Sequence, residues 1–122
     1  MAEPPKQLKK ELAVISQKVH EAELRRALLS LDKEFALWRA GKMDSFELCE
    51  RIHKFHVGPN REIHNKHTVL RSQRDLLIAD AIRRGLIKKD ELSAELYSYL
   101  GRALAFYADV DKRNDAPEEE VE

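Results

Sequence analysis

The sequence predicts an all-α fold in which a long N-terminal helix precedes a compact helical bundle, with four to five helices in all. Charged residues form 36% of the 122 residues, whereas Gly and Pro number only four each. This composition favours amphipathic helices over a sandwich or barrel. Apolar residues recur at intervals of three and four, and no segment alternates as a half-buried strand would. We expect a helical arm over residues 1–23, a helical domain over 24–110 and a disordered acidic tail over 111–122.

The first helix, from about Lys6 to Ala40, carries two apolar stripes on nearly opposite sides. The first consists of Leu8, Leu12, Ile15, Val19 and Ala22, and the second of Leu24, Leu28, Leu31, Phe35 and Trp38. The helix either breaks between His20 and Glu23 or continues and buries its halves against different surfaces. The interval lacks Gly and Pro, which favours a continuous helix.

A continuous helix leaves the front stripe in need of cover. Exposure would forfeit roughly 1.5–3 kcal/mol for each large apolar side chain. A second chain, most simply a twofold mate, would supply the cover. This interpretation predicts a homo-oligomer or a partner protein bound through Leu8, Leu12, Ile15 and Val19. Packing of the same stripe against the last helix of its own chain is the competing interpretation.

The stretch Met43 to His67 contains the strongest local signals. Gly41 ends the first helix, and Asp44 is a good N-cap with Glu47 three residues on. Gly58 suits a left-handed helix end and Pro59 the first turn of a new helix. We therefore expect a corner between two helices, the second beginning near Pro59 or Asn60.

The remaining helices follow from caps and stops. Ser72 to Asp75 offers a cap for a short, apolar and buried helix, which Arg83-Arg84-Gly85 ends. A last helix is expected from about Lys89 to Asp109. It contains Gly101, which suggests the close approach of a neighbouring backbone. Residues from Lys112 onward are expected to be disordered.

The same central stretch holds the one cysteine and four of the five histidines. On a helix, Cys49, His53 and His56 share a face, and the expected corner would fold His64 or His67 toward them. Thiolate and imidazole ligands suit zinc, or copper and nickel, although the spacing matches no common zinc pattern. In the competing interpretation Cys49 packs as a small apolar residue and the histidines cap, pair or face solvent.

Other function classes find less support. The chain lacks a Gly-x-Ser-x-Gly, HExxH, P-loop or dinucleotide motif, which disfavours an enzyme. Residues 51–89 carry ten Lys or Arg against three acidic residues, hence +7, whereas residues 111–122 carry two against six, hence −4. The last helix opens with Asp90-Glu91, which would repel phosphates, so a nucleic-acid partner is not expected. Without an apolar run of about 18 residues, a signal segment or paired cysteines, we expect a cytoplasmic protein and no membrane partner.

Three segments, Trp38 to Leu48, Ile52 to Glu62 (I-H-x-F-H-x-G-P-x-R-E) and Ala81 to Leu86, resemble a group of small bacterial helical proteins with no assigned activity. The resemblance covers about Leu24 to Leu104. It implies a bacterial cytosolic setting and an all-helical fold, and it carries over no catalytic residue. The sequence therefore predicts a non-catalytic interaction protein that self-associates, with zinc binding as the alternative.

Overall fold

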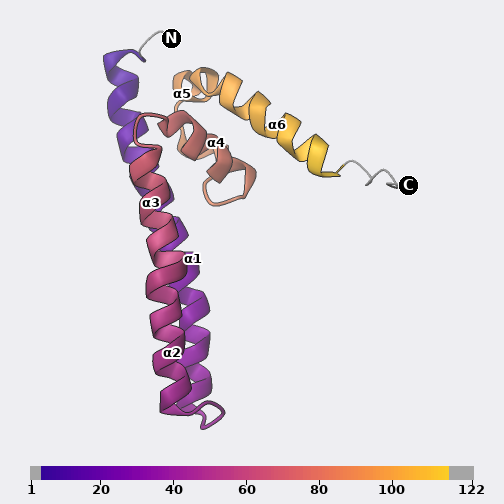
Figure 1. Ribbon diagram of the computed structural model, residues 1–122. Coiled ribbons are helices and arrows are strands. Elements are labelled where there is room, and N and C mark those ends of the chain that lie inside the picture. The colour runs from indigo at the N-terminus through magenta and orange to yellow at the C-terminus, as the bar shows by residue number, and fades with distance from the viewer. Residues whose placement is uncertain (1–3, 116–122) are drawn as a thin grey trace, which may run out of the picture. The chain divides into compact units, whose positions relative to one another are not determined.

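The computed structural model describes residues 4–115, and this part of the chain is helical with no strand (Figure 1). The all-α prediction is confirmed. In order, the elements are α1 (Lys6–Arg39), α2 (Ser45–Phe55), the π-helical turn η1 (His56–Asn60), α3 (Arg61–Val69), α4 (Arg74–Arg83), the 3₁₀ turn η2 (Lys89–Glu91), α5 (Ala94–Tyr99) and α6 (Gly101–Asp115). None of these helices has the length and apolar character needed to cross a membrane.

The chain divides into two compact units, which differ from the predicted domain ranges. Unit 1 combines residues Met1–Ser16 with Gln73–Glu122, and unit 2 is Gln17–Ser72. Helix α1 contributes its first part to unit 1 and its second part to unit 2.

Unit 1 has a well-buried apolar core. Three side chains have no exposed surface: Ile78 of α4, Leu96 of α5 and Leu100 at the end of α5. Three more residues of α4 are also buried, namely Leu77, Ala79 and Ala81. The expectation that residues 76–82 form a short, buried helix is thus confirmed. Ser93 caps α5, because its Oγ accepts from the amide of Leu96 at 3.0 Å. Glu11 of α1 accepts from the amide and the hydroxyl of Ser93, at 2.9 and 2.6 Å, which joins the first part of α1 to the start of α5.

Helix α1 is continuous through His20 to Glu23, as the absence of Gly and Pro predicts. The expectation that its front stripe lacks cover is wrong. Leu8, Leu12 and Ile15 are buried, and Val19 has no exposed surface, without any second chain. The chain's own packing supplies the cover, so these four residues are not a free interface.

Unit 2 is an antiparallel helical hairpin. Along α2 and α3 the partners on α1 run backwards, since Arg51 pairs with Glu34 and His67 with Glu23. Gly41, with φ of +75°, ends α1 as predicted. Asp44 then caps α2, its Oδ1 accepting from the amide of Glu47 at 2.7 Å.

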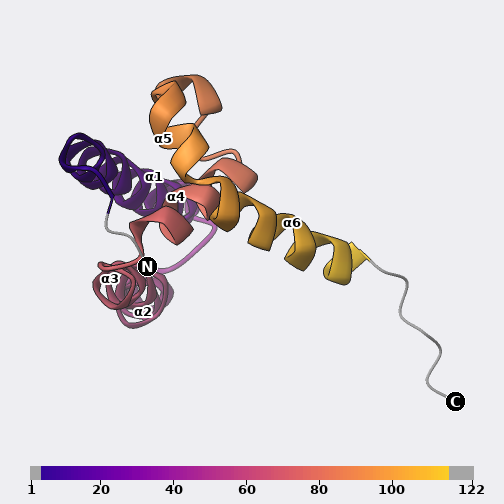
Figure 2. The same ribbon diagram turned by 90° about the horizontal axis from the view of Figure 1, so that it is seen from above.

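The corner expected at Gly58-Pro59 is absent. Gly58 has no positive φ, and the chain passes from α2 through η1 into α3, so that α2 and α3 follow each other in Figure 1 and superimpose when seen from above in Figure 2. The reason lies in Pro59, which has no amide hydrogen and clashes with the carbonyl four residues earlier in a regular α-helix. A π-helical turn widens the backbone at that point and accommodates the proline without ending the helix.

Three further boundaries differ from expectation. Helix α4 is capped by the backbone of Gln73 and not by Ser72. The predicted last helix is interrupted at Leu100. Among residues 4–115, a Cβ on Gly101 would meet nothing within 4 Å, so no backbone in this range approaches it closely. Residues 112–115 are helical, and the remainder of the predicted disordered tail lies outside the described residues.

Candidate functional site

The structure does not bring the five predicted metal ligands together. Cys49, His53 and His56 are exposed on α2 and η1, and the expected burial of the thiol is not found. Since the chain continues as a helix, the 18 residue-to-residue steps from Cys49 to His67 extend over about 27 Å at 1.5 Å per step. Within residues 4–115 no group of three or more His, Cys, Asp or Glu side chains could hold a metal ion.

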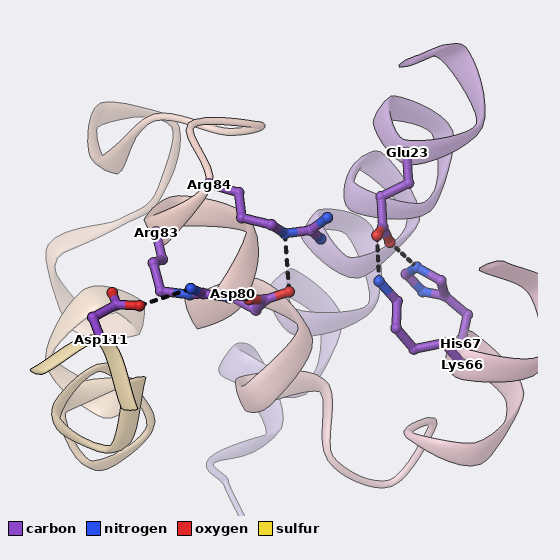
Figure 3. Close-up of polar contacts among 7 residues, drawn as sticks. All are labelled: Glu23, Lys66, His67, Asp80, Arg83, Arg84 and Asp111. Atoms are coloured by element: carbon purple, nitrogen blue, oxygen red, sulfur yellow. Dashed lines mark hydrogen bonds and ion pairs between the residues drawn. The ribbon is translucent and has the colours of Figure 1, made fainter. Parts of the chain in front are cut away.

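A different polar cluster forms where α3 lies against α1 in unit 2, and we call it the histidine cluster. It comprises His20, Glu23, His64, Lys66 and His67. Glu23 is 6% exposed. Its carboxylate accepts hydrogen bonds from His67 Nε2, at 2.5 Å, and from the ammonium of Lys66 (Figure 3). His20 stacks on His67, with ring centroids 4.2 Å apart and planes 5° from parallel. The buried carboxylate thus has two donors, as a buried charge requires.

His20 also meets His64. Its Nε2 lies 3.2 Å from His64 Nδ1, and the two rings pack edge to face with centroids 4.8 Å apart. One of these nitrogens must donate a hydrogen and the other must accept it. If both rings were fully protonated, neither nitrogen could accept, and the bond would be lost.

The environment of His20 disfavours its charged form. Burial is the main reason that its pKa lies below the ordinary 6.5, and the nearby imidazoles of His67 and His64 lower it further against the opposing carboxylate of Glu23. Two charges at the 4.2 Å separation of the His20 and His67 rings would repel by about 1 kcal/mol in water and about 4 kcal/mol at an effective dielectric constant near 20.

Sequence reasoning found His64 and His67 but missed His20 and Glu23. A signal was present, because His20 and Glu23 have the same three-residue spacing on α1 as His64 and His67 have on α3. Each pair therefore lies on one face of its helix. Recognising the match required the antiparallel pairing of the two helices, which the expected corner obscured.

Unit 2 also presents an apolar edge. Arg51 and Glu34 bridge α2 and α1 along one edge of the hairpin, 3.4 Å apart. Ile52 and Phe35 follow each of them by one residue, or 100° around the helix. Because the two helices are antiparallel, both side chains turn to the same side of the hairpin, away from the bridge between Arg51 and Glu34. We call that side, made by Leu28, Leu31, Phe35 and Ile52, the apolar edge.

The apolar edge is only partly covered. Leu28 is 51% exposed and Ile52 38% exposed, while Leu31 and Phe35 are half-buried. Phe46, on the outside of α2, is 87% exposed. Scattered exposed apolar residues are ordinary, but a row contributed by both helices of one hairpin is typical of an interaction surface.

In unit 1, the prominent polar group joins α4 to α6. Asp80 accepts from Arg83, at 2.5 Å, and pairs with Arg84 Nε at 3.0 Å, while Arg83 Nη1 reaches Asp111 at 2.8 Å (Figure 3). The guanidinium of Arg83 also lies 5.1 Å from the ring centroid of Tyr107. Burial, followed by the charge of Asp80, raises the pKa of Tyr107. These contacts fasten α4 to α6 within unit 1.

Comparison of the chain with protein-family models, with curated proteins and with solved structures gives no match.

Proposed function

We propose that this protein is a non-catalytic helical interaction protein that self-associates through the apolar edge of unit 2. The observation that carries the proposal is the exposure of Leu28 and Ile52 on facing helices of one hairpin. The proposal keeps the predicted class of function and moves the contact surface from the front of α1 to its second part.

A second copy of the chain fits this edge best. Two helices can cover only part of each other's apolar stripes, whereas four helices enclose a core between them. A twofold axis would place the edge of one hairpin against the identical edge of another, so each exposed leucine would face apolar side chains of the partner.

Charge does not oppose this association. The whole chain carries 22 basic and 22 acidic residues, so its formal net charge is zero. Unit 2 alone has eleven Lys or Arg and eight Asp or Glu, hence only +3. A chain with so little net charge has little self-repulsion to overcome.

The test is the oligomeric state of the full chain, measured by analytical ultracentrifugation across a wide concentration range. The wild type is expected to form dimers. The variant Leu28→Glu should weaken them by about 30-fold or more, because a twofold interface loses the leucine twice and half-burial of each contributes about 1 kcal/mol.

Leu29→Glu is the matched control. Leu29 is the same residue type, is 57% exposed and lies one position further along α1, and therefore points 100° away from the apolar edge. It should leave the dimer intact. A wild type that stays monomeric throughout, or dimers that Leu29→Glu disrupts and Leu28→Glu does not, would overturn the proposal.

A further inference from the structure

We propose that the histidine cluster is a proton-sensitive latch, which holds α3 against α1 in unit 2 at neutral pH and releases it when the imidazoles take up protons. The latch depends only on contacts between α1 and α3 of one chain, whereas self-association depends on contacts between two chains. Either proposal can therefore fail without the other.

The first support is the charge balance of the cluster. With neutral imidazoles, the carboxylate of Glu23 is balanced by the ammonium of Lys66, which it contacts. Glu23 is the only acid among the five side chains, and it already receives two donors. Each added proton therefore brings positive charge that no further carboxylate of the cluster offsets.

The second support is the position of His20 between the two histidines of α3. It stacks on His67 and shares one hydrogen with His64 at 3.2 Å. If His20 and His64 are both protonated, neither nitrogen can accept the hydrogen bond between them. If His20 and His67 are both protonated, two positive charges lie face to face. Both consequences act on contacts that join α1 to α3.

The direction of the pH effect follows from His20, because the folded protein favours the neutral form of its ring. The pKa of His20 is lowered from 6.5, chiefly by burial and then by His67 and His64, while Glu23 opposes and Lys66 reinforces the shift. The stabilisation that depends on the neutral ring is complete above about pH 6.5 and is lost as the pH falls through the lowered pKa. Mild acid is thus expected to open the latch, in the range where histidine switches operate.

The experiment is amide hydrogen exchange on the full chain at about pH 7.5 and pH 5, expressed as protection factors so that the intrinsic pH dependence of exchange is removed. In the wild type, protection of residues 61–69 should fall by about tenfold or more in acid, while that of α6 in unit 1 changes by less than about threefold. In His20→Gln, which retains a polar side chain that does not titrate, the acid-dependent loss should shrink to less than about threefold.

His53→Gln is the matched control, because it removes an exposed imidazole from the same unit outside the cluster. It should keep the full pH response of the wild type. A response that is equal in α3 and α6, or that survives His20→Gln, would overturn the latch.

A second measurement covers the case in which His20→Gln does not fold. Nitrogen NMR of the wild type should show the ring of His20 taking up its proton below the ordinary pKa of 6.5, with loss of the hydrogen bond between His20 Nε2 and His64 Nδ1 over the same pH range. An ordinary pKa for His20, or a hydrogen bond between His20 and His64 that persists when His20 is protonated, would also overturn the proposal.

Discussion

Unit 1 and unit 2 are both helical, but they bury their apolar residues to different extents. In unit 1, Ile78, Leu96 and Leu100 are fully buried, and α4 has four buried residues among its ten. In unit 2, α2 buries only Leu48 and α3 buries none of its nine residues. Unit 1 thus has the core of a small domain, whereas unit 2 leaves much of its apolar surface available.

The polar groups differ in the same sense. The contacts of unit 1 join the carboxylates of Asp80 and Asp111 to the guanidinium of Arg83, and the ordinary pKa values of these residue types lie far from neutrality. The histidine cluster of unit 2 combines imidazoles, the side-chain type whose ordinary pKa lies nearest neutrality, with a buried carboxylate. We infer from this contrast that the core of unit 1 contributes most of the stability. The contacts that depend on pH or on a partner are those of unit 2.

Truncation of the unit 1 core is expected to have the largest effect on stability. Leu96→Ala removes a fully buried side chain and should lower the free energy of unfolding by about 2–5 kcal/mol, through lost burial and a residual cavity. Leu28→Ala, on the exposed edge of unit 2, should cost less than about 1 kcal/mol in the monomer.

Urea unfolding distinguishes the two units, because the single tryptophan, Trp38, lies in unit 2 and circular dichroism reports all helices. Leu96→Ala should move the circular dichroism transition to lower urea and shift the Trp38 fluorescence transition less. Equal shifts of both signals would mean that the two units unfold as one and that the contrast between them does not extend to stability.

The next largest effect is expected at the buried carboxylate of unit 2. Glu23→Gln leaves Lys66 and His67 without their anionic acceptor and should destabilise unit 2 by about 2 kcal/mol, less than a fully buried pair because Lys66 is one-third exposed. The loss should appear in the Trp38 fluorescence midpoint at neutral pH.

Glu21→Gln provides the comparison for that variant. Glu21 lies two residues before Glu23 on α1 and pairs with Arg25, but both side chains are well exposed. Its loss should cost at most about 0.5 kcal/mol. If the two variants were equally mild, the histidine cluster would contribute no more than an ordinary surface ion pair.

These contrasts also explain which features the sequence could predict. The Asp44 cap and the left-handed glycines at 41 and 85 were predictable, since each depends on a few neighbouring residues. The continuity of α1 likewise followed from local propensity. The same local rules failed at Gly58, which has no positive φ, and at Ser72, which does not cap α4.

Pairing between distant segments was not predictable in the same way. Pro59 was interpreted as a corner, because a π-helical turn has no common sequence signature, and that error displaced His64 and His67 from their true neighbours. The front stripe of α1 was correctly identified as apolar, but its pattern could not show whether its own chain or a second one covers it. The hydrophobic period identifies a buried face and leaves its partner unspecified.

The smallest effects are expected at Gly85 and Gly101 of unit 1, two glycines with space for a side chain. A Cβ would meet nothing within 4 Å at Gly85 or at Gly101, so steric contact decides neither case. Gly85 has φ of +74°, which costs an L-residue about 1–2 kcal/mol, so Gly85→Ala should destabilise by that amount. Gly101 begins α6 with no positive φ, and Gly101→Ala should stabilise by about 0.4–1 kcal/mol by restricting the unfolded chain. Thermal unfolding followed by circular dichroism should therefore give shifts of opposite sign, and shifts of the same sign would show that the backbone at one of these two helix ends differs from that described.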